Sequence, residues 1–284
     1  MLSRLLRPFS RLIPVKYQFP VQGFFKVKTD DDAAFYIEGH LTSYITKVCF
    51  WKGIKGFEYD SVKIFAGLVK NINVFVDIGA NIGYYSLLAS CINDRLNVIA
   101  FEPFNDACEA LKLNIMYNRF RNIKVEEVAL SDKAGVATLY YAINKDFPDY
   151  KYQLGGKNSL VEFENSPSGK IEIFTMTLDD YAIQNDLVEV DLIKMDTEAT
   201  EYFILKGAEN LIKKCKPIIL CEVLTGYNED KLEELFLRLE YGFYLVKENV
   251  LSRINSLKNS PNHKNDYFFI PDGKEHIIKR YLSS

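Results

Sequence analysis

From residue 73 onward, short apolar runs rich in β-formers alternate with stretches that carry one apolar stripe at helical spacing. This alternation is typical of β–α–β units, in which helices cover both faces of a mostly parallel sheet. The apolar runs are dense enough to be buried on both sides. We therefore expect an α/β fold with strands at residues 73–78, 97–102, 123–128, 191–195 and 217–223.

Additional strands are predicted around this core. Residues 136–143 and 171–176 have the pattern of an antiparallel pair, and Phe243–Lys247 and Tyr267–Ile270 predict a terminal hairpin at the sheet edge. The stretch 144–170 is rich in Lys, Gly, Asn, Ser and Pro and is long for a connector. Loops of this length are usually functional or disordered, so we expect a lid over the active edge of a domain at 71–284.

The N-terminal part differs in charge from the rest of the chain. Residues 1–29 contain six basic side chains and no acidic one, which predicts a basic arm. Apolar residues at helical spacing within it favour contact with an anionic membrane surface or a transit peptide. Pro8 and Pro14 interrupt that helix and favour an irregular arm packed on the main domain. Residues 30–70 are expected to form a mainly helical extension.

Composition excludes several classes of protein. The chain has 35 Lys and Arg against 38 Asp and Glu, a net charge of −3, which gives no general attraction to nucleic acid. No apolar run reaches the roughly 18 residues of a membrane span, so we expect a soluble protein. The five cysteines form no CxxC pair and indicate reduced thiols in the cytoplasm. The three histidines are too scattered for an HExxH zinc site.

A glycine-containing turn follows the first predicted strand of the sheet. Asp77, Gly79, Asn81 and Gly83 lie between that strand and a helix, where α/β sheets bind ligands. Glycines let a ligand approach the backbone, and the helix N-terminus offers N–H groups to a carboxylate. Asp77 is expected to bind a cationic amine. Glu102, at the end of the second strand, is placed to accept hydrogen bonds from ribose hydroxyls.

These features together favour a nucleoside ligand that carries both an amine and a carboxylate. S-adenosylmethionine is such a ligand. NAD is the alternative cofactor, but its sites use a G-x-G-x-x-G turn, whereas this turn has the pattern D-x-G-x-N-x-G.

An ordered set of motifs over residues 57–223 resembles the FkbM family of S-adenosylmethionine-dependent methyltransferases. The set comprises VFVDIGANIGYYS at 74–86, VIAFEP at 98–103, VALSD at 128–132, Asn158-Ser159-Leu160, TLDDY at 177–181, DLIKMDTEATE at 191–201 and the strand Pro217–Glu222. The resemblance implies a Rossmann-like methyltransferase fold with a seven-stranded sheet of order 3-2-1-4-5-7-6. It also implies methyl transfer to a hydroxyl of a sugar or secondary metabolite.

The resemblance carries over to particular residues. It implies that Pro103, with Glu102, binds the cofactor and that Ser131 and Asp132 lie near the adenine, the alternative for this pair being a surface turn. It places Asn158 and Ser159 at the substrate. The chain has Glu198-Ala199-Thr200-Glu201 where members generally show E-G-x-E, so Ala199 adds a methyl group near the active edge.

Three carboxylates are expected to converge on one edge of the sheet. Asp196 ends the fourth strand, Glu198 follows it, and Glu222 ends the fifth. A carboxylate can remove the proton of an attacking hydroxyl, and crowded like charges raise one another's pKa. We expect the base among Asp196, Glu198 and Glu222, in that order. Glu201 is expected to complement a helix dipole. The same trio could hold Mg²⁺, which we do not favour.

The sequence thus favours an O-methyltransferase whose acceptor is a sugar, glycan, glycolipid or related small molecule. Two alternatives stay open. One is a non-catalytic module that binds S-adenosylmethionine. The other is a protein or nucleic-acid methyltransferase, which the negative net charge disfavours.

Overall fold

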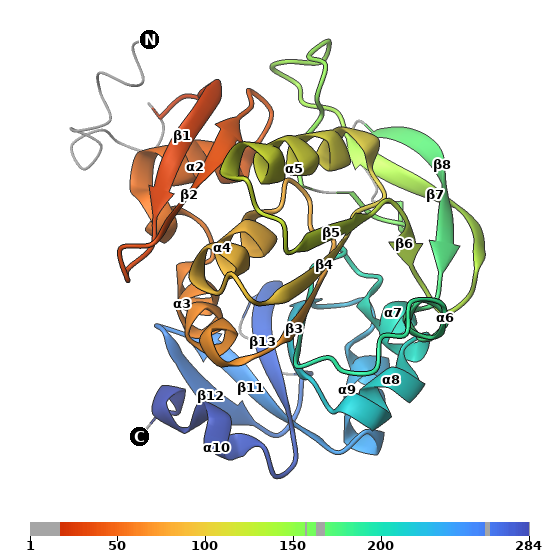
Figure 1. Cartoon of the computed structure of the whole chain (residues 1–284). Helices are drawn as coiled ribbons and strands as arrows, with labels where there is room; N and C mark the ends of the chain where they lie inside the picture. The colour runs from red at the N-terminus through yellow and green to blue at the C-terminus, as the bar shows by residue number, and fades with distance from the viewer. Residues whose placement is uncertain (1–17, 157, 163–167, 259–261, 284) are drawn as a thin grey trace.

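The computed structural model of the chain describes residues 18–156, 158–162, 168–258 and 262–283. At its centre lies one sheet with helices on both faces (Figure 1). The strands of this sheet are β3 (Val74–Ile78), β4 (Asn97–Phe101), β5 (Ile123–Glu126), β9 (Leu192–Met195), β10 (Ile218–Leu224), β11 (Tyr241–Lys247), β12 (Val250–Ile254) and β13 (Lys264–Pro271).

The strand order is β12-β11-β13-β10-β9-β3-β4-β5. Strands β10, β9, β3, β4 and β5 are parallel, whereas β13 runs antiparallel to β10 and β11. This order agrees with the one that the family resemblance implies and confirms the α/β methyltransferase fold. The expected number of seven strands was wrong, because β12 adds an eighth at the edge. A two-residue turn, Glu248-Asn249 with φ of 52° and 64°, connects β11 to β12 without the glycine that usually marks such hairpins.

Helices pack on the two faces of the sheet as two hydrophobic layers. One face is covered by α3 (Tyr59–Leu68), α4 (Tyr84–Ile92), α5 (Asn105–Asn118) and α10 (Glu275–Ile278). The other is covered by α6 (Leu178–Gln184), α7 (Glu201–Lys206), α8 (Glu209–Cys215) and α9 (Glu229–Arg238). The three-layer arrangement leaves the carboxyl ends of the parallel strands open at one edge, where α/β sheets bind ligands.

The N-terminal part contains strands that the sequence analysis did not predict. Strands β1 (Gly23–Lys28) and β2 (Ala34–Gly39) form an antiparallel pair with Phe25 opposite Ile37. The expected boundary between a basic arm at 1–29 and a mainly helical extension at 30–70 is therefore wrong, because the two strands lie on either side of it. Alternate residues of both strands are buried, which fixes the pair against the domain. Residues 1–17 of the expected arm lie outside the described residues.

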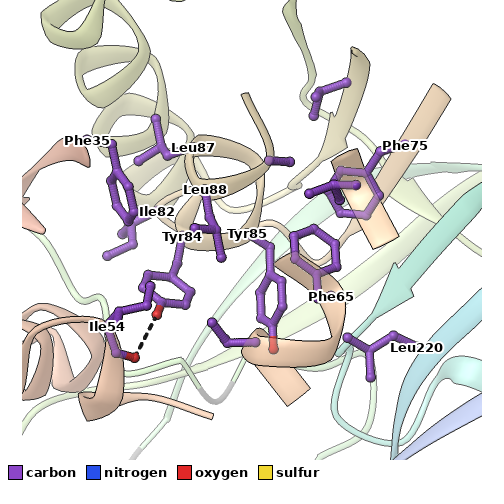
Figure 2. Close-up of a cluster of buried hydrophobic side chains, with 14 of the residues drawn as sticks. Phe35, Ile54, Phe65, Phe75, Ile82, Tyr84, Tyr85, Leu87, Leu88 and Leu220 are labelled. Atoms are coloured by element: carbon purple, nitrogen blue, oxygen red, sulfur yellow. Dashed lines mark hydrogen bonds between the residues drawn. The ribbon is translucent and has the colours of Figure 1, made fainter. Parts of the chain in front are cut away.

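Helix α2 (Tyr44–Lys52) and the 3₁₀ turn η3 (Gly53–Gly56) join this pair to α3. Figure 2 shows how the extension packs on the sheet through Tyr84 and Tyr85 of α4. The Tyr84 ring contacts Phe35 and Phe57 edge-on, and the Tyr85 ring contacts Phe65. The extension and the sheet therefore share one hydrophobic core.

A separate three-stranded sheet follows β5. It contains β6 (Ala129–Leu130), β7 (Gly135–Ala142) and β8 (Ser168–Met176), in the order β6-β8-β7. The antiparallel pairing of β7 with β8 confirms the strand pair expected there. The end of the expected lid segment, 168–170, is part of β8, and residues 157 and 163–167 lie outside the described residues. Within the described ranges, no helix is long and apolar enough to cross a membrane.

Candidate active site

A cavity of about 510 Å³ opens at the carboxyl ends of β3, β4, β9 and β10. The turn after β3 forms its floor, and Glu102-Pro103 after β4 forms one side. Residues 154–156 and 158–160, with residues of α2 and of the turn before α3, close it from the other directions. Seven of the residues that the sequence analysis singled out for the cofactor or for chemistry line this cavity: Gly79, Asn81, Glu102, Pro103, Asp196, Glu198 and Glu222. Asn158 and Ser159, expected at the substrate, line it as well.

The glycine turn is fixed by its close approach to the next strand. Gly79 has φ of 73°, and a Cβ at this position would lie 2.2 Å from the carbonyl oxygen of Asp196. Glycine is therefore required where the end of β3 meets the end of β9. This contact brings the turn and Asp196 to the same edge.

Asp77 and Gly83 do not line the cavity, contrary to the expectation for this turn. Asp77 is fully buried beneath it, where its Oδ2 accepts a hydrogen bond from the Ser86 hydroxyl at 2.6 Å. Burial raises the pKa of Asp77, although the Lys194 ammonium acts in the opposite direction. Gly83 packs against Leu111 of α5. Both residues belong to the support of the turn, because strand alternation and the helix start point them away from the opening.

Glu102 shapes the turn directly. Its Oε2 accepts a hydrogen bond from the Asn81 N–H at 2.8 Å, and its Oε1 accepts one from the Phe104 N–H at 2.9 Å. Burial raises the pKa of Glu102 to about 7, and these two backbone N–H groups limit the rise. The carboxyl thus holds the loop after β3 against the end of β4 and lines the cavity at the same time.

Ser131 and Asp132 do not line the cavity, so the adenine contact expected of them is not supported. Val128, Ala129 and Leu130 line it instead. The Asp132 carboxylate faces outward and pairs with the Lys206 ammonium at 3.0 Å. The alternative of a surface position, left open by the sequence, is the one that the structure supports.

Asn158 and Ser159 lie where a substrate could contact them. Ser159 is held by two backbone hydrogen bonds to Tyr140, and its hydroxyl donates to the carbonyl oxygen of Glu198. Within the described part of the chain, the buried Oδ1 of Asn158 has no hydrogen-bond partner. An unpaired buried acceptor is costly, so this oxygen is suited to a ligand donor.

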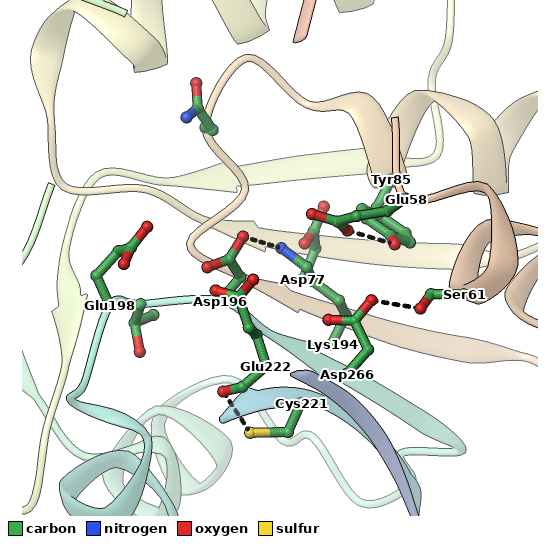
Figure 3. Close-up of polar contacts among 12 residues, drawn as sticks. Glu58, Ser61, Asp77, Tyr85, Lys194, Asp196, Glu198, Cys221, Glu222 and Asp266 are labelled. Atoms are coloured by element: carbon green, nitrogen blue, oxygen red, sulfur yellow. Dashed lines mark hydrogen bonds and ion pairs between the residues drawn. The ribbon is translucent and has the colours of Figure 1, made fainter. Parts of the chain in front are cut away.

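The carboxylates at the far end of the cavity surround two lysines. Figure 3 shows Asp196 at the centre, with Glu58 on one side and Glu222 on the other. Lys194 Nζ lies 3.6 Å from Asp196 Oδ2, and Lys264 Nζ lies 2.5 Å from Glu222 Oε2. Glu198, the third of the expected carboxylates, pairs through its Oε1 with Lys264 at 3.1 Å.

The pKa values of Asp196 and Glu222 are driven apart. Burial raises the pKa of Asp196, but the nearby ammonium groups of Lys194 and Lys264 outweigh burial and hold it below the usual value. Burial and the Asp196 charge raise the pKa of Glu222. Two adjacent carboxyl groups in which one is ionised and the other retains a proton are typical of acid–base sites. Asp196 is therefore the group of the pair that is ready to accept a proton.

The set of acidic groups close enough to share a cation differs from the expected one. Among the described residues, ligand atoms of Glu58, Asp196 and Glu222 lie within 4.8 Å of one another, and Glu198 is not part of the group. Two lysine ammonium groups already provide positive charge there. This arrangement favours direct carboxyl chemistry over the Mg²⁺ alternative.

Glu201 occupies the first position of α7, as expected for a residue that complements a helix dipole. Its Oε1 accepts hydrogen bonds from the N–H and the hydroxyl of Thr197, at 2.9 and 3.0 Å. Burial raises the pKa of Glu201 to about 7. The side chain fixes the turn that carries Asp196 and Glu198.

Four residues of the site were missed by the sequence analysis: Glu58, Lys194, Lys264 and Asp266. Lys194 gave a signal, since it is the one charged side chain within the apolar strand β9. The other three come from segments far apart in the sequence, and no local pattern indicates their meeting.

Comparisons with known proteins identify methyltransferases to which this chain is similar. The chain is 29% identical over 158 residues to 31-O-demethyl-FK506 methyltransferase FkbM of Streptomyces tacrolimicus, which covers 49% of this chain and 60% of that protein. It is 23% identical over 194 residues to hexuronic acid methyltransferase AglP of Haloferax volcanii, covering 68% and 73%. It is 27% identical over 167 residues to 2-O-methyltransferase NoeI of Sinorhizobium fredii, covering 57% and 65%. The chain thus spans about three fifths of the first of these relatives.

A solved structure, methyltransferase FkbM from Methylobacillus flagellatus, aligns with a TM-score of 0.43 at 18% identity and covers 69% of this chain and 43% of that one. The profile described as "Methyltransferase FkbM domain" matches residues 77–245, which is more than half of the chain. The protein therefore belongs to the FkbM methyltransferase domain family.

Proposed function

We propose that this protein is an S-adenosylmethionine-dependent O-methyltransferase whose acceptor is a hydroxyl of a sugar, glycan, glycolipid or related small molecule. The observation that carries the proposal is that one cavity is lined both by Glu102, at the ribose position of this sheet type, and by an ionised Asp196. The names of two relatives, a hexuronic acid methyltransferase and a 2-O-methyltransferase, support a sugar acceptor.

The residues present fit the cofactor. Each carboxylate oxygen of Glu102 accepts one backbone N–H and keeps a lone pair for a ribose hydroxyl. The Oδ1 of Asn158, which has no hydrogen-bond partner among the described residues, offers a further acceptor in the same cavity. The cavity volume is within the usual range for small-molecule sites. When bound, S-adenosylmethionine supplies a methyl group on a positively charged sulfur, which leaves as a neutral thioether.

The chain's own task is to hold the acceptor oxygen and take its proton. An alcohol becomes strongly acidic as its oxygen forms a third bond, to the transferred methyl group, so a carboxylate with a low pKa still accepts its proton. Asp196 is ionised and lies in the cavity, which suits it to this role. Lys194 keeps it ionised before the reaction, and Asp77 beneath the cavity balances the charge of Lys194.

Calorimetric titration tests the cofactor assignment. The wild type is expected to bind S-adenosylmethionine and not NAD, and Glu102→Ala is expected to weaken binding at least about tenfold, because two hydroxyls lose a charged partner. Asp132→Asn is the matched control, since it removes a carboxylate that faces away from the cavity and should leave the dissociation constant unchanged. Equal losses in both variants, or tight NAD binding, would contradict the assignment.

The remaining alternatives differ in measurable ways. A non-catalytic module would bind S-adenosylmethionine and transfer no methyl group to any hydroxyl acceptor. A nucleic-acid methyltransferase would bind RNA or DNA with an affinity that falls steeply with salt. Magnesium dependence would appear as loss of activity with a chelator and its return with Mg²⁺.

We also infer that the N-terminal part contacts an anionic membrane surface in the cytoplasm. Lys26 and Lys28 are exposed on β1, beside the stacked rings of Phe24 and Tyr117, and basic and aromatic side chains together are typical of interfacial contact. The five cysteines are free thiols, which agrees with a reducing compartment. The full chain should sediment with vesicles that contain anionic lipid. The Lys26→Glu/Lys28→Glu double variant should sediment with them to a smaller extent. Equal sedimentation of both proteins would refute the contact.

A further inference from the structure

Glu58 lines the active-site cavity, although in the sequence it precedes the region that the family profile matches, which starts at residue 77. It precedes α3 as its N-cap and has φ of 43° and ψ of 40°, a left-handed conformation that few residues other than glycine adopt. Strain of this kind persists only where the surrounding structure fixes it, and it gathers at functional sites. The position of Glu58 therefore calls for an explanation in terms of the cavity.

The segment before Glu58 is held tightly. A Cβ on Gly56 would lie 2.3 Å from the carbonyl oxygen of Val48, so the turn can pack against α2 only with glycine there. Phe57 packs edge-on against Tyr84, with ring centroids 5.5 Å apart. The Tyr85 hydroxyl donates a hydrogen bond of 2.7 Å to Glu58 Oε2. Three neighbours thus fix the carboxyl on the wall of the cavity that faces Asp196 and Glu222 (Figure 3).

The spacing of the three carboxyl groups suits oxygen atoms of an acceptor. One oxygen of each of Glu58, Asp196 and Glu222 lies within 4.8 Å of the others. Three atoms no more than 4.8 Å apart have between them a point that is at most about 2.8 Å from each, which is a normal O–H···O distance. A hydroxyl group placed between them is within reach of all three.

Charge balance decides which groups donate and which accept. Lys194 and Lys264 are the ammonium groups that act on six carboxyl groups, namely Glu58, Asp77, Asp196, Glu198, Glu222 and Asp266. Some of these carboxyl groups must therefore keep their protons. Burial raises the pKa of Glu58 to about 8, with Asp266 and Asp196 adding to the rise, whereas Asp196 is ionised. Glu58 is a hydrogen-bond donor in neutral solution and Asp196 an acceptor.

A single attacking hydroxyl cannot form hydrogen bonds with Glu58, Asp196 and Glu222 at the same time. It has one proton, which goes to Asp196, and two lone pairs, one of which must face the transferred methyl group. The second lone pair can accept from one carboxyl at most, and Glu222 lies on the same sheet edge as Asp196. The donor on the opposite wall, Glu58, then needs a different oxygen of the acceptor.

We propose that Glu58 is a further acceptor-binding residue, which donates a hydrogen bond to an oxygen next to the attacking hydroxyl, so that the acceptor is a compound with neighbouring hydroxyl groups. This inference rests on the proposed O-methyltransferase function and adds a residue and a substrate feature to it. The N-terminal extension then contributes to the selection of the acceptor.

The test compares methyl glycosides of hexoses and hexuronic acids that carry adjacent hydroxyls with deoxy counterparts that lack one of the pair. For the wild type, kcat/KM should fall about tenfold from the best diol to its deoxy counterpart, the worth of one hydrogen bond. Glu58→Ala should lower kcat/KM for the diol about tenfold and lose the preference over the deoxy compound. Glu58→Gln keeps an N–H donor of similar shape and should retain most of the preference.

Tyr59→Phe is the matched control, because it removes the hydroxyl of the next residue, which donates a hydrogen bond to Asp30 away from the cavity, and leaves Glu58 and its contacts in place. It should keep the preference for the diol. The inference is overturned by a Glu58→Ala variant that still prefers the diol, by a Tyr59→Phe variant that loses the preference to the same degree, or by a wild type that methylates no diol. Calorimetric binding of S-adenosylmethionine, measured on every variant, separates these outcomes from failure of the proposed function, in which the wild type itself does not bind the cofactor.

Discussion

Replacement of Lys194, a buried lysine of the active-site cavity, tests most directly whether its charge stabilises the surrounding carboxylates. Lys194 is 6% exposed, and its ammonium lies 3.6 Å from Asp196 and also acts on Asp77, Glu58 and Glu222. Coulomb attraction across 3.6 Å amounts to about 5 kcal/mol at an effective dielectric constant of about 20. Desolvation of the ammonium offsets part of this, so we expect Lys194→Met to lower the free energy of unfolding by about 3 kcal/mol at pH 8.

The loss should depend on pH in one direction. Burial lowers the pKa of Lys194, but its carboxylate neighbours outweigh burial and raise it above the usual value. The contribution of Lys194 in the wild type is therefore complete below the unfolded pKa of about 10.4 and constant between pH 5 and 9. In the variant, the carboxyl groups of Asp77 and Asp196 lose their counterion and their folded pKa values rise. In the variant, ionisation of each of these groups then lowers the free energy of unfolding by about 1.4 kcal/mol per pH unit between its unfolded and its folded pKa.

Urea unfolding at pH 5.5 and at pH 8 measures both effects, provided that the slope with urea stays the same. The deficit of Lys194→Met relative to the wild type should be larger at pH 8. Lys206→Met is the control, because its half-exposed ion pair with Asp132 should contribute less than about 1 kcal/mol. A deficit under about 1 kcal/mol at pH 8, or the same deficit at both pH values, would refute the reasoning.

Two further predictions concern the turn after β9. Ala199 is buried with φ of 76°, so Ala199→Gly should stabilise the protein by up to about 1 kcal/mol. The control Ala110→Gly, within α5, should destabilise it by at least about 1 kcal/mol. A destabilised Ala199→Gly variant in thermal unfolding would contradict this prediction. Glu201 has its folded pKa raised to about 7, so its ionisation destabilises the wild type as pH rises from about 4.3 to 7 and adds no further cost above that. The free energy of unfolding of Glu201→Gln relative to the wild type should therefore increase by roughly 1 kcal/mol per pH unit over that interval, and a difference that does not change with pH would exclude the assignment.

The central sheet was predictable because its signal is local. Each parallel strand is a short apolar run followed by an amphipathic helix, and residues at the ends of neighbouring parallel strands must meet at one edge. Glu102, Asp196 and Glu222 were placed correctly at the cavity by that rule alone. Strands β1 and β2 gave a weaker signal, because they are half-buried and their connection carries three consecutive aspartates and no glycine.

The rest of the site depends on contacts that no sequence window contains. Strand alternation directs Asp77 beneath the cavity, and an expectation based on the motif alone assigned it to the ligand. Asp132 follows β6, which belongs to the separate small sheet. The rule that neighbouring parallel strands of the central sheet end at one edge therefore does not place it at the cavity. Glu58, Lys264 and Asp266 come together only through the packing of both chain ends on the sheet.

The Ser61 hydroxyl of α3 donates a hydrogen bond to the carboxylate of Asp266 on β13, across 205 positions of the chain. Glu58 lies before the matched region and Lys264 after it, so both flanks add side chains to the end of the cavity that contains Asp196 and Glu222. The glycine turn and Glu102 lie within the matched region. The cofactor side of the cavity thus lies within the matched region, and part of the acceptor end lies outside it. Exchange of the flanking segments between relatives would transplant acceptor preference onto an unchanged cofactor half, which makes chimaeras of this family a rational route to new hydroxyl specificities.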